Sequence, residues 1–132
     1  MLSVDLPSVY KFYGKVFDDA IRLHQEAGVP LLAIHIGGWE VPDGAWSGHD
    51  RHEMKELFIN NMLDLAEARD IRLAGWEDIA RGLEPATQER LKRSLYYLNV
   101  WNTDGIEGFP VVLSPAAYTY LDLAYSDAPN IA

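Results

Sequence analysis

The chain contains no cysteine, few basic residues and no long hydrophobic run. Without cysteine there is no disulfide bond and no thiolate chemistry, and the redox compartment is left open. Eleven Lys and Arg stand against 20 Asp and Glu, and the net charge of −9 argues against nucleic acid and anionic membranes as partners. No stretch approaches the ~18 apolar residues of a membrane span and no basic leader segment is visible, so we expect a cytoplasmic location by default.

Apolar residues are nevertheless plentiful enough for a core. The sequence has 132 residues, of which 48% are hydrophobic, and this favours a single domain over residues 1–132. Apolar spacing predicts helices over 7–27, from about 54 to 69, and over 84–93. Short apolar or aromatic runs predict strands over 31–34, 71–75, 95–101 and 111–114. This alternation is typical of α/β folds, in which helices cover parallel strands.

One connection interrupts the alternation. Only residues 102–110 separate the third and fourth expected strands, whereas a crossover between parallel strands needs a dozen or more residues and usually a helix. We therefore expect these two strands to be antiparallel, separated from each other, or paired with another chain.

The segment His35-Ile36-Gly37-Gly38-Trp39-Glu40 is the most informative part of the sequence. It closes the apolar run 31–34, which Pro30 and the two glycines bound, and which we interpret as a strand buried on both faces. Glu40 then lies on the loop at the end of this strand, where barrel enzymes hold their catalytic groups. The alternative is a glycine-rich turn with a solvated glutamate. His35 is interpreted as a hydrogen-bonded structural histidine.

A second polar cluster lies near the start of the second helix. Its members are His49, Asp50, His52, Glu53 and Glu56. The i,i+4 spacing of His52 and Glu56 could bind a metal, but a zincin pattern would need histidine at both positions. We interpret the cluster as a solvated helix N-terminus, where the helix dipole favours acidic side chains. Neither a metal nor a cofactor is predicted.

Four segments, in this order, resemble the catalytic domain of glycoside hydrolase family 20, whose members are β-N-acetylhexosaminidases. They are residues 35–42, 75–78, 99–102 and 112–122. The similarity runs over nearly all of this chain and covers about half of the family's (β/α)8 barrel, roughly its fourth to seventh strands. It implies a partial, half TIM-type (β/α) barrel with about four mostly parallel strands and covering helices.

The resemblance also implies a substrate-assisted hydrolysis of terminal β-linked N-acetylhexosamine, in which the 2-acetamido oxygen of the sugar attacks the anomeric carbon. Glu40 would be the general acid that then activates water. Trp76 and Trp101 would pack against the sugar and wall its acetamido pocket. Tyr120 would bond the acetamido oxygen and Asp122 a sugar hydroxyl. The alternative roles are core packing for the two tryptophans, and a surface position at a helix end for Tyr120 and Asp122.

Trp39 departs from the family's pattern. The family places an Asp directly before its acid, and this carboxylate orients the acetamido group and stabilises the positive charge of the cyclic intermediate. Indole offers one donor and no acceptor, so Trp39 cannot compensate that charge. The family's sugar-binding Arg near the first strand, and the Trp and Glu near the eighth, also have no counterpart in these 132 residues.

Four strands would leave two unpaired sheet edges and one uncovered apolar face, so we expect a homodimer or a higher homo-oligomer. Three functions stay open. The first is a residual or assembled glycosidase that acts through Glu40. The second is a non-catalytic protein that binds amino sugars through Trp76, Trp101 and Tyr120. The third is a folded fragment without activity. Trp39 and the missing strands favour the last of these for the isolated chain.

Overall fold

Helices and strands alternate in the computed structural model, which describes residues 3–38, 41, 48–102 and 105–120. Three helix–strand pairs come first, followed by a fourth strand and a short helix. They are α1 (Pro7–Glu26), β1 (Ala33–His35), α2 (Arg51–Glu67), β2 (Arg72–Trp76), α3 (Pro85–Ser94), β3 (Leu95–Val100), β4 (Val111–Leu113) and α4 (Ala116–Thr119). A 3-10 turn, η1 (Glu77–Ala80), follows β2. The expected helices and strands are confirmed with small shifts at their ends, whereas η1 and α4 were not predicted.

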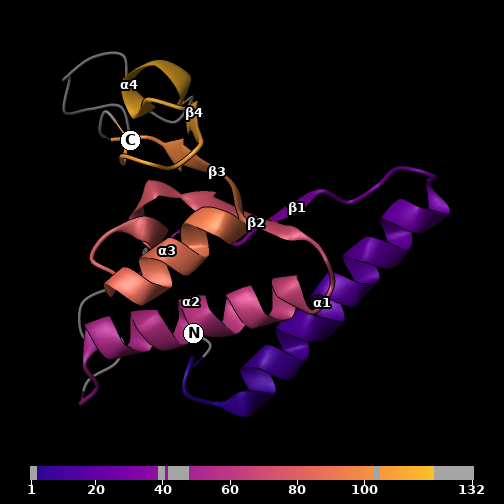
Figure 1. The fold of residues 1–132 in the computed structure, drawn as a ribbon. Coiled ribbons are helices and arrows are strands. Elements are labelled where there is room, and N and C mark those ends of the chain that lie inside the picture. Colours follow the sequence, from indigo (N-terminus) through magenta and orange to yellow (C-terminus); the bar gives the residue numbers. More distant parts are fainter. Residues whose placement is uncertain (1–2, 39–40, 42–47, 103–104, 121–132) are drawn as a thin grey trace, which may run out of the picture.

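All four strands form one parallel sheet in the order β1-β2-β3-β4. The helices α1, α2 and α3 lie on the same side of this sheet, below it in Figure 1. Because the strands are parallel, their carboxyl ends all meet at one edge. The predicted α/β class and partial (β/α) barrel are confirmed. None of the described helices is long and apolar enough to cross a membrane.

The core lies between the helices and the sheet. In α2, Ile59, Met62 and Leu63 are fully buried, and they pack in one hydrophobic cluster with Leu73 of β2 and Leu98 of β3. Burying one such aliphatic side chain contributes about 1.5–3 kcal/mol. The sheet is therefore held against α2, and the carboxyl ends of β2 and β3 have a rigid support.

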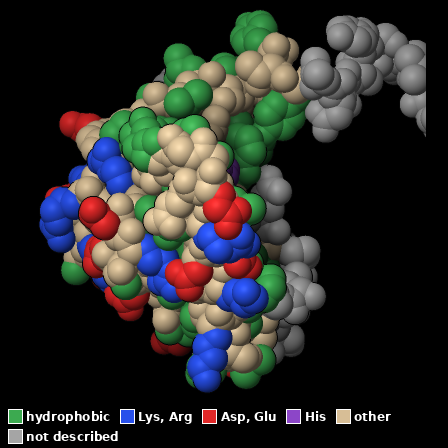
Figure 2. Space-filling model, turned by 90° about the vertical axis from the view of Figure 1, so that its right-hand side faces the viewer, with side chains coloured by type: hydrophobic (Ala, Val, Ile, Leu, Met, Phe, Trp, Pro, Cys, Tyr) green, Lys and Arg blue, Asp and Glu red, His purple; other side chains and the backbone are tan. Residues whose placement is uncertain are grey.

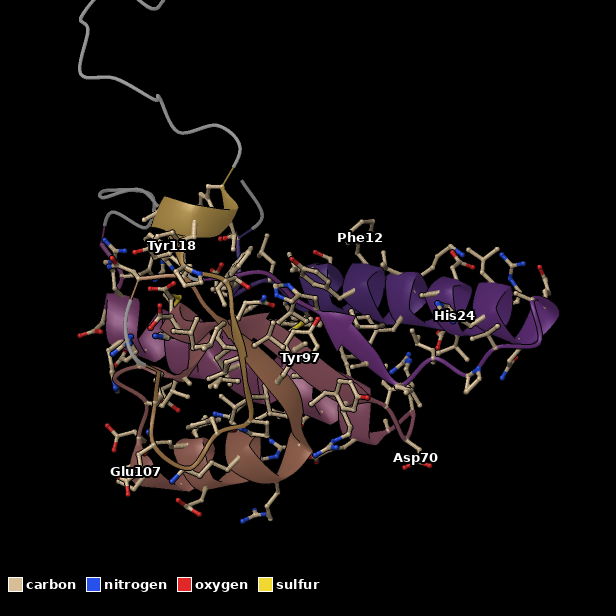
Figure 3. The ribbon with its side chains drawn as sticks, turned by 90° about the horizontal axis from the view of Figure 1, so that it is seen from above. Phe12, His24, Asp70, Tyr97, Glu107 and Tyr118 are labelled. Carbon is tan, nitrogen blue, oxygen red and sulfur yellow. The ribbon has the colours of Figure 1, made fainter. Side chains whose placement is uncertain are left out.

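An irregularity in β3 decides which side chains face away from the helices. The register of β2 and β3 shifts between Leu73 and Ala74, so that Tyr96 has no partner in the ladder. Leu95 and Leu98 consequently both lie in the core. Tyr97 pairs with Ala74 on the opposite face, which Figure 3 shows from above. Extra residues of this kind commonly redirect side chains near functional sites.

The expectation for the third and fourth strands is wrong. β4 pairs with β3 of the same chain in parallel, with Leu98 opposite Val111 and Val100 opposite Leu113. The physical reason is the register, because β4 begins beside Leu98 and the chain returns along β3 by only two residues, about 7 Å. This short return needs no helix, and the described residues of the connection, 101–102 and 105–110, contain none.

Burial of the first strand on both faces is also wrong. Ala33 and Ile34 are only partly buried, His35 is exposed and the preceding Leu32 is 56% exposed. Within the described residues, β1 pairs with β2 alone and is an edge strand. A local apolar run cannot show whether a second neighbour covers it, so the pattern 31–34 overstated the burial.

Exposed hydrophobic side chains gather around β4, the strand at the opposite side of the sheet from β1. Val111, Val112 and Leu113 of β4 are all exposed, and so is Tyr118 of α4. Figure 2 shows this upper part as largely hydrophobic or uncharged, whereas Lys, Arg, Asp and Glu lie interspersed over the lower part. The expected homo-oligomer stays a prediction.

Candidate functional site

After β1 the chain continues beside the carboxyl-terminal half of β2. The Ile36 N–H donates to the Ala74 carbonyl at 2.9 Å, and the Trp76 N–H donates to the Gly37 carbonyl at 2.8 Å. Gly38 then lies directly against the Trp76 side chain, where a Cβ would stand 2.7 Å from the indole Cδ1. Any larger residue at this position would collide with the tryptophan.

Three of the five predicted site residues are described. Trp76 ends β2, Trp101 follows β3 directly, and Tyr120 follows α4 after β4. Glu40 and Asp122, together with Trp39, lie outside the described residues.

Trp101 and Tyr120 lie together. Their rings stack with centroids 6.5 Å apart and planes inclined by 21°. The Ala116 N–H also donates to the Trp101 carbonyl at 2.9 Å, which ties the start of α4 to the end of β3. The structure thus joins the aromatic groups that follow β3 and β4.

Trp76 lies instead toward β1, beside His35. Their ring centroids are 5.3 Å apart in an edge-to-face arrangement, and the ring of Tyr97 is 6.3 Å from the imidazole. Nδ1 of His35 accepts a hydrogen bond from the Gly37 N–H at 3.1 Å. Desolvation lowers the pKa of His35, and its hydrogen bond with Asn99 opposes this. The predicted hydrogen bonding of His35 is confirmed.

Two carboxylates that the sequence reasoning missed support Trp101. Glu77 is 1% exposed, and its Oε1 accepts hydrogen bonds from the N–H groups of Trp101 (3.1 Å) and Asn102 (2.8 Å). Its Oε2 forms an ion pair with Arg81. Oδ2 of Asp78 accepts the indole N–H of Trp101 at 2.8 Å. A carboxylate is buried only where such partners replace water.

Lys55 holds the turn that carries these two carboxylates. It extends from α2, is 8% exposed, and its Nζ donates to the carbonyls of Asp78 and Arg81, both at 2.6 Å. Burial lowers the pKa of Lys55 to about 8. The turn η1 is therefore held by α2 through Lys55, and by the residues after β3 through their hydrogen bonds to Glu77 and Asp78.

The pKa of Lys55 predicts a specific pH dependence of stability. Between pH 8 and about 10.4 the native state binds fewer protons than the unfolded chain, so the contribution of Lys55 to stability rises with pH. We expect Lys55→Met to be less stable than the wild type, with a deficit larger by about 2 kcal/mol at pH 10 than at pH 7.5. Guanidinium unfolding of both proteins at both pH values measures this. An equal deficit at the two pH values would contradict the prediction.

The polar cluster at the start of α2 is a capped helix N-terminus, as interpreted. The Asp50 side chain accepts hydrogen bonds from the N–H groups of His52 (2.7 Å) and Glu53 (3.2 Å). Glu56 does not join His52 in a ligand pair, because its Oε1 accepts the Glu84 N–H at 2.6 Å. Within the part of the chain that the structure describes, no three His, Asp or Glu side chains lie close enough to hold a metal.

Comparison with known proteins identifies the family. The model of the glycosyl hydrolase family 20 catalytic domain matches residues 1–132. The chain belongs to this family. The resemblance carried by the four ordered segments is thereby confirmed.

Relatives of this family 20 chain are much longer than it is. It is similar to a beta-hexosaminidase of Vibrio furnissii, with 30% identity over an alignment 144 positions long that covers 98% of this chain and 22% of that protein. It is also similar to beta-hexosaminidase B of Pseudoalteromonas piscicida, with 28% identity over an alignment 154 positions long that covers 98% of this chain and 19% of that protein. The chain thus spans about a fifth of the length of these curated relatives. No solved structure matches.

Proposed function

We propose that this chain supplies part of the active site of a family 20 glycoside hydrolase that cleaves terminal β-linked N-acetylhexosamine. One observation supports this above all. Trp76 ends β2, Trp101 follows β3 and Tyr120 follows α4 after β4, so all three come from the carboxyl ends of neighbouring strands of one parallel sheet. These are the strand ends at which (β/α) barrels hold their active sites.

The described side chains suit an amino sugar. Indole and phenol rings pack well against the apolar face of a pyranose and against an acetyl methyl group. Because Asp78 accepts the only hydrogen-bond donor of the Trp101 side chain, this indole would meet the sugar through its ring rather than through a hydrogen bond. The hydroxyl of Tyr120 can donate to the acetamido oxygen.

Glu40 would supply the acid chemistry. It stands two residues after Gly38, and Gly38 lies against the side chain of Trp76 at the end of β2. As the acetamido oxygen bonds to the anomeric carbon and the glycosidic bond breaks, Glu40 would give its proton to the departing oxygen. Its carboxylate would next take a proton from the water that attacks the anomeric carbon and opens the cyclic intermediate. These steps require no cofactor.

A non-catalytic amino-sugar-binding protein is the second candidate. Trp39 favours it, because an indole cannot replace the carboxylate that the family places before its acid. The aromatic groups around Trp101 could then bind the sugar without cleaving it.

A pair of substrates tests the proposed function. The purified chain is incubated with a chromogenic β-N-acetylglucosaminide and with the matching β-glucoside, which lacks the acetamido nucleophile. We expect the first to be hydrolysed at least about 100-fold faster, because only this substrate carries the positioned attacking oxygen. Equal rates would contradict the proposal. Saturable binding of N-acetylglucosamine without hydrolysis of either substrate would support the binding protein instead.

A further inference from the structure

We propose that Asp78 and Glu77 are positioning residues that fix Trp101 in the orientation in which it meets the sugar. The relevance to a sugar rests on the proposed function above. The positioning itself rests on contacts between described residues. Neither carboxylate is assumed to touch the ligand.

Asp78 fixes the edge of the indole ring. The Trp101 indole N–H donates to Oδ2 of Asp78 at 2.8 Å, and a hydrogen bond to a charged acceptor is stronger than one between neutral groups. Rotation of the ring about its side-chain bonds would break this bond. Tyr120 covers one face of the same ring. The orientation of Trp101 is thus set at its edge by Asp78 and on one face by Tyr120.

Glu77 holds the main chain at Trp101 in place. One carboxylate oxygen accepts the N–H groups of two consecutive residues, Trp101 and Asn102, while the other oxygen faces Arg81. Because Glu77 is buried, loss of the carboxylate would leave these backbone donors without a partner in a place that water does not readily reach. Glu77 therefore binds the two residues after β3 to η1 through two backbone hydrogen bonds.

The arrangement couples the two tryptophans of the site. Trp76, Glu77 and Asp78 are consecutive, so one short segment provides the first aromatic side chain and positions the second. Lys55 of α2 holds this segment in place, because it donates hydrogen bonds to the carbonyls of Asp78 and Arg81. The relative placement of Trp76 and Trp101 is consequently determined by η1.

Variants of Asp78 test the proposal in the full chain. The indole N–H resonance of Trp101 is assigned by its loss in Trp101→Phe, and the Kd for N-acetylglucosamine is measured by titration. We expect Asp78→Ala to shift this resonance and to raise the Kd about tenfold. Asp78→Asn, which keeps an acceptor oxygen, should restore most of both. The control Asp70→Asn, an exposed position ahead of β2, should leave both at the wild-type values.

Glu77→Gln tests the second carboxylate. Its neutral oxygen accepts more weakly than a carboxylate, so the amide protons of Trp101 and Asn102 should exchange with solvent about tenfold faster than in the wild type. The conservative replacement keeps the shape of the side chain and avoids a cavity.

Two results would overturn the positioning of Trp101. They are an indole resonance unchanged in Asp78→Ala, and a shift in Asp78→Asn as large as that in Asp78→Ala. The failure of the proposed function is distinguishable. If the resonance follows the expected series while the wild type binds no N-acetylglucosamine, Trp101 is positioned as proposed and the assigned ligand is wrong.

Discussion

Glu40→Gln is expected to lower kcat/KM for a chromogenic β-N-acetylglucosaminide by about 10²–10⁴-fold. Glutamine has nearly the shape of glutamate, but it cannot give a proton to the departing oxygen or take one from water. The expectation rests on membership of family 20 and on the place of Glu40 in the segment 35–42. Release of the chromophore by the two purified proteins at equal concentration measures the ratio.

A matched exchange at the surface separates this loss from a general effect of removing a carboxylate. Glu107 is exposed on the connection between β3 and β4, and Figure 3 shows it apart from the labelled Tyr118 of α4. We expect Glu107→Gln to retain the wild-type rate. Activity retained in Glu40→Gln would mean that another group is the acid. An equal fall in both variants would remove any special role for Glu40.

The element order could be predicted because it depends on local patterns. The apolar spacing that predicts a helix over 7–27 agrees with α1, which ends at Glu26 shortly before Gly28, a glycine with φ of +70°. The apolar spacing likewise agrees with α2 and α3, because their buried residues recur at helical spacing. Side-chain periodicity reports which residues face a core, and it does so without knowledge of the neighbours.

Strand pairing could not be predicted in the same way, because it depends on register. The connection 102–110 is too short for a helical crossover. It is nevertheless long enough to join two parallel strands, because β4 starts beside Leu98. The unpaired Tyr96 in β3 is equally invisible in the sequence, although it decides that Tyr97 faces away from the helices. Edge position escaped prediction too, as the exposure of Leu32 shows.

For the candidate site, motifs placed the residues at strand ends but did not reveal what holds them. Trp76 and Trp101 were predicted from their segments, and the parallel sheet brings those segments to one edge. Glu77 and Asp78 were missed as supports because they contact residues 23 to 25 positions away. An acidic pair directly after a buried strand is a signal that could have indicated them, since acids seldom remain beside a core without partners.

Trp39→Asp is expected to raise kcat/KM by about 10²–10³-fold, the effect typical of one electrostatic group aimed at a developing charge. The cyclic intermediate formed by the acetamido group is positively charged. A carboxylate at position 39 would stabilise it and orient the acetamido nitrogen, whereas indole offers one N–H donor and no acceptor. The replacement also restores the residue that family 20 places before its acid.

Two further variants decide why the rate changes. Trp39→Asn removes the bulk of the indole and matches the shape of aspartate without its charge, so we expect most of the gain to be absent. A gain as large as that of Trp39→Asp would mean that the indole acts by filling the pocket. The double variant Trp39→Asp, Glu40→Gln should fall back below the single Trp39→Asp by about 10²–10⁴-fold, because the restored carboxylate assists a reaction that still needs its acid. Hydrolysis unchanged in Trp39→Asp would show that position 39 does not limit this chain.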